Sequence, residues 1–100
     1  MDNARTSYTL TAKARDRHAR ELFDLTRVRQ AIENRATEGY RDLRLVQEHP
    51  FDLSQSAPAR QLEDWLEANQ YRYAWSPTPP LADPLHSSLS EDYLELAVFW

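Results

Sequence analysis

The stretch DYLELAVFW, residues 92–100, is the most apolar segment of this 100-residue chain. Four large apolar side chains fall on alternate positions, namely Leu94, Leu96, Val98 and Trp100. The other face would carry Tyr93, Glu95, Ala97 and Phe99. Such alternation predicts a β-strand with one buried face, because successive side chains of a strand point to opposite sides of the sheet. Burial of four large apolar groups contributes on the order of 6–12 kcal/mol, so we expect this strand to lie in the core.

Two further strands are expected earlier in the chain. In YRDLRLVQ, residues 40–47, Leu43 and Leu45 fall on one side and charged residues on the other. In YRYAWS, aromatic residues alternate with smaller or charged ones, and we pair residues 71–75 antiparallel with the last strand. The segment between these two strands, residues 76–91, contains four of the six prolines. Proline is excluded from helix interiors and central strands, so we predict a long loop there.

Helical periodicity covers residues 9–38. Apolar residues recur three or four positions apart, at Ala12, Ala19, Leu22, Leu25, Val28, Ile32 and Ala36. We expect Thr9 or Thr11 to cap the start, which leaves residues 1–8 as a flexible N-terminus. Gly39, the only glycine, is expected to end the helix in a left-handed conformation. A break at Leu25–Thr26 into two helices is the alternative.

A second helix is expected over SAPARQLEDWLEANQ, residues 56–70. Ser56 is a suitable N-cap, and Pro58 is tolerated in the first turn, where its missing N–H would be unpaired anyway. Asn69 is expected to provide a left-handed stop. The acidic residues of this helix are predicted to face water, and they are Glu63, Asp64 and Glu67.

These elements predict an α+β fold in a single domain, residues 1–100. A long N-terminal helix and a second helix would pack on one face of a small three-stranded, mainly antiparallel β-sheet. The second helix connects the first two strands, and that crossover would be right-handed if those strands run parallel.

Composition narrows the functional classes. The net charge is −4, yet residues 1–45 hold ten Lys/Arg against seven Asp/Glu, and residues 46–100 hold two against nine. Cysteine is absent, which excludes disulfides and thiolate metal sites. No apolar run approaches the roughly 20 residues that span a bilayer, so we predict no membrane partner. The absence of cysteine fits a reducing, cytoplasmic location.

Several short features together suggest a relationship. They are the start of the long helix at Thr11, Ala12 and Arg15, the stop at Gly39, the step at residues 66–71, and the hydrophobic strand at 96–100. This layout resembles small accessory proteins of tailed bacteriophages and prophages. Arg15 departs from that pattern by one position, Asn69-Gln70 stands where glycine is common, and the proline-rich loop is unusual. The resemblance implies a fold and a phage origin, hence the cytoplasm of an infected or lysogenic bacterial host. It transfers no catalytic residue.

Catalytic and metal-binding motifs are not expected. The histidines, His18, His49 and His86, are isolated in sequence, and one glycine cannot build a phosphate-cradling loop. His86, Ser87 and Ser88 fit turn residues better than a hydrolytic triad, which needs a rigid base and an oxyanion hole. The paired carboxylates, including Glu91 and Asp92, fit solvated charges. We therefore predict no enzymatic activity, no metal and no cofactor.

Two surfaces are candidates for binding. The first is a basic face of the long helix, formed by Lys13, Arg17, Arg20 and Arg27. Acidic residues interrupt it, so a solvated helical face is favoured over a nucleic-acid site. The second is an aromatic set on the two paired strands, which is Tyr71, Tyr73, Trp75, Tyr93 and Phe99. Tyrosine and tryptophan are preferred hot-spot residues of protein interfaces, although the same rings also suit the core.

We therefore predict a non-enzymatic protein-binding module, a phage-encoded modulator or inhibitor that occludes a host protein. Its partner would be a host or phage protein, or a second copy joined through a sheet edge. The alternatives are a nucleic-acid-binding accessory protein that uses the basic helix and a minor structural protein of a virion or assembly.

Overall fold

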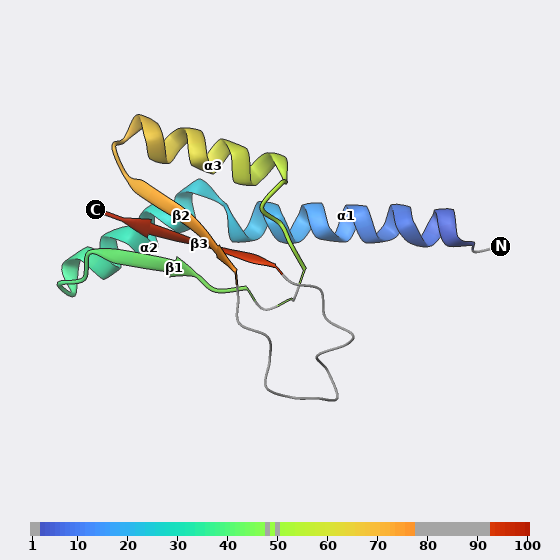
Figure 1. The fold of residues 1–100 in the computed structure, drawn as a ribbon, viewed down its shortest axis with the longest axis horizontal. Coiled ribbons are helices and arrows are strands. Elements are labelled where there is room, and N and C mark those ends of the chain that lie inside the picture. The colour runs from blue at the N-terminus through green and yellow to red at the C-terminus, as the bar shows by residue number, and fades with distance from the viewer. Residues whose placement is uncertain (1–2, 48, 50, 78–92) are drawn as a thin grey trace, which may run out of the picture.

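The computed structural model describes residues 3–47, 49, 51–77 and 93–100. Figure 1 shows an α+β arrangement, which confirms the predicted fold class. The elements are α1 (Ala4–Leu22), α2 (Leu25–Thr37), β1 (Asp42–Leu45), α3 (Ala57–Ala68), β2 (Arg72–Pro77) and β3 (Leu94–Phe99). The predicted start of the proline-rich loop at residue 76 is wrong by two residues, because Ser76 and Pro77 pair with β3 as the end of β2, an edge strand in which proline is tolerated. The rest of that predicted loop, with His86, Ser87, Ser88, Glu91 and Asp92, lies outside the described residues.

The last strand, β3, lies in the middle of the three-stranded sheet, in the order β1-β3-β2. It runs antiparallel to both neighbours, so the predicted pairing of β2 with β3 is confirmed. Val98 stands opposite Leu43 on one side and Tyr73 on the other. β1 and β2 point the same way but do not touch, because β3 separates them.

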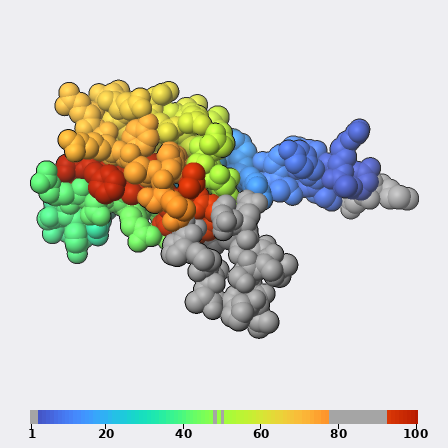
Figure 2. Space-filling model, viewed as in Figure 1, coloured from blue at the N-terminus to red at the C-terminus, as the bar shows by residue number. Residues whose placement is uncertain are grey.

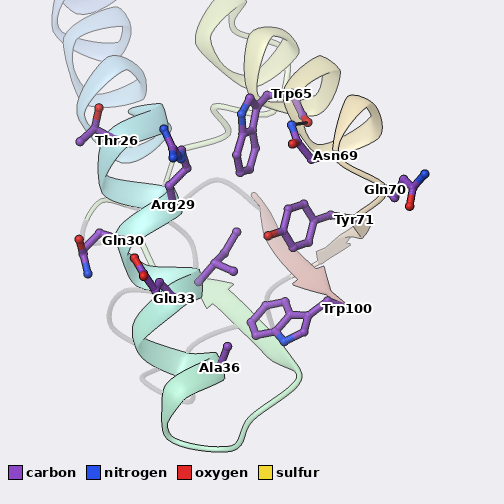
Figure 3. A pocket seen from close by; sticks show the side chains of 11 residues that line it. Thr26, Arg29, Gln30, Glu33, Ala36, Trp65, Asn69, Gln70, Tyr71 and Trp100 are labelled. Carbon is purple, nitrogen blue, oxygen red and sulfur yellow. Dashed lines mark hydrogen bonds between the residues drawn. The ribbon is translucent and has the colours of Figure 1, made fainter.

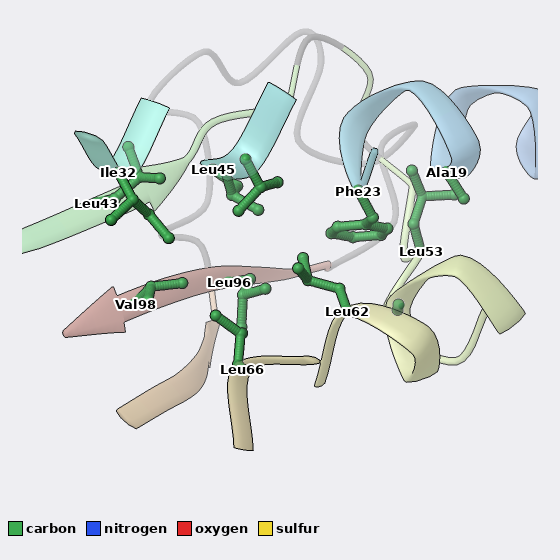
Figure 4. Close-up of a cluster of buried hydrophobic side chains, with 12 residues drawn as sticks. Ala19, Phe23, Ile32, Leu43, Leu45, Leu53, Leu62, Leu66, Leu96 and Val98 are labelled. Carbon is green, nitrogen blue, oxygen red and sulfur yellow. The ribbon is translucent and has the colours of Figure 1, made fainter. Parts of the chain in front are cut away.

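The helices pack on one face of this sheet. From β3, Leu96 and Val98 point into that layer and are fully buried, as the alternation predicts (Figure 4). Leu94 and Trp100, assigned to the same face, are half-buried. The remaining core side chains come from all three helices, β1 and the loop before α3: Ala19, Phe23, Val28, Ile32, Leu43, Leu45, Leu53, Ala59, Leu62 and Leu66.

The opposite face of the sheet carries smaller and charged side chains, and β3 and β2 reach the surface there (red and orange in Figure 2). Ala97 lies at its centre between Arg44 and Ala74 in register. Arg44 donates to both carboxylate oxygens of Glu95, at 3.3 and 3.2 Å. Phe99 is 39% exposed on this face.

A break divides the long N-terminal helix into α1 and α2. Asp24 has extended backbone angles (φ −61°, ψ 123°), and its carboxylate accepts from the Arg27 amide at 3.0 Å. It therefore caps α2, one residue before the Leu25–Thr26 position considered in the sequence. Phe23 is buried at the same break, so the turn places an aromatic ring in the core.

The start of α1 lies earlier than expected. Asn3 caps it by accepting from the Thr6 amide at 3.0 Å, and the predicted caps at Thr9 and Thr11 are wrong. The two threonine hydroxyls instead donate to helix carbonyls one turn back. Residues 4–8, expected to be flexible, form the first turns of α1.

The other helix ends follow local chemistry. Gly39 has φ +100° and Ser56 accepts from the Ala59 amide, so both predicted caps are confirmed. The predicted left-handed stop at Asn69 is wrong by one residue, since Asn69 has φ −104° and Gln70 has φ +64°. The following amide, of Tyr71, donates to Leu66 O at 2.9 Å, which closes α3 by a six-to-one bond.

Replacing the cap of α2 tests the break. Asp24→Ala is expected to lower the free energy of unfolding by about 1 kcal/mol, because the Arg27 amide loses its acceptor. Denaturant-induced unfolding measures this change. The matched control is Asp64→Ala within α3, where alanine is the better helix former and stability should not fall. Equal stability of wild type and Asp24→Ala would contradict the assigned cap.

Candidate functional site

An open groove of about 820 Å³ lies between α2 and the C-terminal end of α3. One wall, the aromatic wall, is formed by Trp65 of α3, Tyr71 just before β2 and Trp100 just after β3 (Figure 3). The other wall is α2, with Ile32 and Ala36 among its lining residues. The groove therefore brings together segments that are up to 74 positions apart in sequence, from Thr26 to Trp100.

The three rings of the aromatic wall form one contiguous row. The centroids of Trp65 and Tyr71 are 5.6 Å apart with the rings nearly parallel, at 21°. Tyr71 and Trp100 are 6.2 Å apart and meet edge to face, at 88°. Both are preferred aromatic geometries, so the row is held in place before any ligand binds. All three side chains are half-buried, which leaves part of each ring facing the groove.

Trp100 is anchored through its backbone. Its amide donates to Arg41 O at 3.1 Å, and the Arg41 guanidinium donates back to Trp100 O at 3.1 Å. These two bonds extend the β1–β3 ladder by one residue. The indole is thereby fixed at the end of the central strand.

The wall formed by α2 has a repeating pattern. Arg29, Glu33 and Ala36 line the groove at helical spacing, and Ile32 contributes an apolar floor that is almost fully buried. Ala36 is exposed and small, so it leaves room beside Trp100 (Figure 3). The two charged groups on this wall have opposite sign and give it no net charge.

The structure does not bring the five predicted aromatic residues onto one surface. Tyr71 lines the groove, whereas Tyr73 and Trp75 pack against α3 on the helix-covered face. Phe99 lies on the opposite face of the sheet, and Tyr93 is half-buried just before β3.

The acidic residues of α3 do not all face water, so that prediction is wrong for Glu63. Glu63 is only 9% exposed. It accepts from Trp75 Nε1 at 3.1 Å and from Arg60 Nη1 at 2.9 Å. Glu67 accepts from the Tyr73 hydroxyl at 2.6 Å. These carboxylates fasten β2 to α3, a role that no local pattern in the sequence indicates.

The predicted basic face is divided by the helix break. Lys13, Arg17 and Arg20 lie on α1, and Arg20 pairs with Asp16 at 3.0 Å. Arg27 belongs to α2 and donates to Glu21 O at 3.3 Å. The four residues therefore do not form one continuous helical surface.

Two of the histidines, expected to be isolated, lie together. The rings of His18 and His49 are 4.3 Å apart, and His49 stacks on Phe51 at 5.4 Å. Within the described ranges, no group of three histidine, cysteine or carboxylate side chains is placed to hold a metal ion. None of the described helices is long and apolar enough to cross a membrane.

Sequence reasoning missed Trp65, Ile32, Ala36 and Trp100 as members of one site. Ile32, Ala36 and Trp100 were each expected on the apolar side of their own helix or strand, and Trp65 lies within the predicted second helix. Their meeting depends on how α2 and α3 pack over the sheet. The chain matches no protein-family model, no curated protein and no solved structure. The bacteriophage resemblance therefore stays a prediction.

The Tyr73 hydroxyl provides a test of the α3–β2 contact. Its hydrogen bond to Glu67 and the nearby negative charge stabilise the neutral phenol, which raises the pKa of Tyr73 from 10.0 to about 12. This stabilisation is present below pH 10 and is lost as the pH rises through about 12. We expect Glu67→Gln to lower the Tyr73 pKa and Glu33→Gln to leave it unchanged. Ring-carbon NMR titration measures both, and an ordinary pKa for Tyr73 in the wild type would contradict the contact.

Proposed function

We propose that this chain is a non-enzymatic protein-binding module whose groove between α2 and α3 receives an amphipathic helix of a partner protein. One observation carries the proposal: three half-buried aromatic rings stand in a row along an open groove. Trp and Tyr are the residue types most enriched among interface hot spots, because each offers a large apolar area at low conformational-entropy cost.

The length of the groove favours a helix as the occupant. Its α2 wall runs from Thr26 to Ala36, which at the rise of an α-helix is about 15 Å, or close to three turns. A helix laid alongside α2 could present apolar residues at i, i+3 or i+4, and i+7 to the row of rings. A small molecule would fill only part of such a length.

The charges of the groove favour apolar recognition over electrostatic steering. Arg29 and Glu33 flank the opening with one charge of each sign, and apolar Ile32 and Ala36 lie on the same wall. Affinity for a helix would thus come mainly from burial of apolar area, at roughly 25 cal/mol per Å² before the cost of association.

The biological setting of this proposal is suggested by the resemblance of the sequence to bacteriophage accessory proteins. A phage-encoded modulator that occludes a host protein is one protein-binding role that the groove would suit. A structural role in a virion would use the same surface. Nucleic-acid binding is less favoured, because the basic residues are split between α1 and α2 and Arg20 is paired with Asp16.

A displayed library of amphipathic helical peptides tests the groove and requires no identified partner. We expect enrichment of peptides with large apolar residues at helical spacing, and loss of their binding in Ala36→Arg, whose side chain would fill the groove beside Trp100. The matched control is Ala68→Arg, an exposed alanine of α3 outside the groove.

The expected loss for Ala36→Arg is about tenfold or more, the order of one hot-spot contact, with Ala68→Arg at wild-type affinity. Circular dichroism should show both variants folded. Selection of no helical peptide, or binding that Ala36→Arg leaves intact, would reject the groove as the binding site for a helix of another protein.

A further inference from the structure

The N-terminal half of α1 extends away from the rest of the fold. Residues 3–13, which we call the arm, are exposed at every position, including Tyr8 at 76% and Leu10 at 63%. In Figure 1 the arm points to one end of the long axis of the molecule, 51 Å in extent. The side-chain hydrogen bonds described for the arm all stay within it, from Thr6 to Asn3, Thr9 to Arg5 and Thr11 to Ser7.

The arm carries an apolar stripe that continues the core-facing side of α1. Ala4, Tyr8 and Ala12 are spaced four residues apart, and the same stripe leads on to Ala19 and Phe23, which are buried. Leu10 points to nearly the opposite side, because two residues correspond to about 200° around a helix. The stripe thus presents one large ring between two small residues.

A helical segment of this length gains little stability from its own backbone. Isolated helices shorter than about 12–15 residues are marginal in water, and most helical stability comes from packing of the apolar side. The half of α1 after Ala12 packs on the fold, whereas the stripe on the arm faces solvent. Among the described residues, nothing therefore packs against the apolar stripe of the arm.

We infer that the arm of one copy of this chain docks into the aromatic groove of a second copy, and that the exchange is reciprocal. The inference rests on the proposed function in taking the groove as a helix-binding surface. Arm and groove lie at opposite ends of the long axis, with Trp100 beside the C-terminal label and the arm beside the N-terminal label of Figure 1. A two-fold axis that aligns two copies antiparallel brings both arm–groove pairs together at once.

The area involved decides between a closed dimer and an open chain. An arm of about 16 Å that buries half of its circumference removes about 250 Å² from each side, or about 500 Å² for one contact. A single contact of that size lies in the range of crystal-packing contacts, and stable interfaces need about 1,000 Å² or more. Reciprocal exchange places two contacts in one interface and reaches that size, whereas an open chain has one contact at each junction.

The charges of the arm disfavour pairing of two arms with each other. Arg5, Lys13 and Arg17 make the arm and the turn after it basic, and Asp16 is paired with Arg20. Antiparallel arms would bring these like charges together. The groove offers one cation, Arg29, and one carboxylate, Glu33, so it does not repel the arm in this way.

Sedimentation analysis over a concentration series tests the exchange. The wild type is expected to pass from 11.7 kDa to about twice that mass. Tyr8→Glu should weaken the dimer about tenfold or more, and Leu10→Glu, which also replaces a large apolar side chain of the arm, should not. Glutamate is a better helix former than tyrosine, so a lost dimer would not reflect a lost arm. Ala36→Arg should weaken the dimer as Tyr8→Glu does, and Ala68→Arg should not.

A wild type that stays monomeric at every concentration would overturn the exchange, as would equal effects of Tyr8→Glu and Leu10→Glu. A dimer insensitive to Ala36→Arg would place the arm elsewhere, and a mass that rises past twice the monomer would reject the closed form. These outcomes are separate from the peptide selection. If the protein is monomeric and captures helical peptides, only the exchange is rejected. If it forms a dimer that Tyr8→Glu and Ala36→Arg weaken, yet selects no helical peptide, only the external partner is rejected.

Discussion

β3 is packed between β1 and β2 and joins the sheet to the helix layer. Leu96 and Val98 are the meeting point of both sheet pairings and of the helix layer, since Leu43 and Leu45 face them from β1, and Tyr73 and Trp75 from β2. Full burial of each of these two side chains contributes about 1.5–3 kcal/mol. β1 and β2 do not touch each other, so both outer strands depend on β3 for their place in the sheet.

The groove follows from this arrangement. β3 carries Trp100 one residue past its end, where the Arg41 backbone and guanidinium hold it. The closing turn of α3, with Gln70 left-handed, delivers Tyr71 beside it. Ile32 and Ala36 then face this pair from α2 (Figure 3). The groove is thus made of residues at or near the ends of β3, α3 and α2.

Local periodicity and chemistry made most of the fold predictable from the sequence. The strands, the fold class, the caps at Ser56 and Gly39, and the burial of Leu96 and Val98 each depend on side-chain spacing or on a single residue type. The break at Asp24 lies within a residue or two of the predicted alternative. A capping carboxylate accepts from an amide two or three residues further on, so the chemistry of the cap locates a helix start to within one turn. Propensity favours Asn69 over Gln70 as the left-handed residue, but the amide of Tyr71 closes α3 only if Gln70 takes that position.

The site was less predictable, since it depends on tertiary packing. Tyr71, Tyr73 and Trp75 alternate in one segment, yet only Tyr71 lines the groove, because Glu63 and Glu67 draw the other two toward α3. Trp65 and Trp100 carry no local sign that they meet. The exposed arm cannot be recognised from the sequence for the same reason, as its apolar stripe continues that of the packed half of α1 without interruption.

Amide hydrogen exchange measures whether β3 is the most stable strand of the sheet. If β3 is the shared partner of both outer strands, the amides of Leu96 and Val98 belong to the slowest class and exchange only through global unfolding, with the free energy of that transition. Exchange of these amides at the rate of an unstructured peptide, while those of α3 remain protected, would contradict the account.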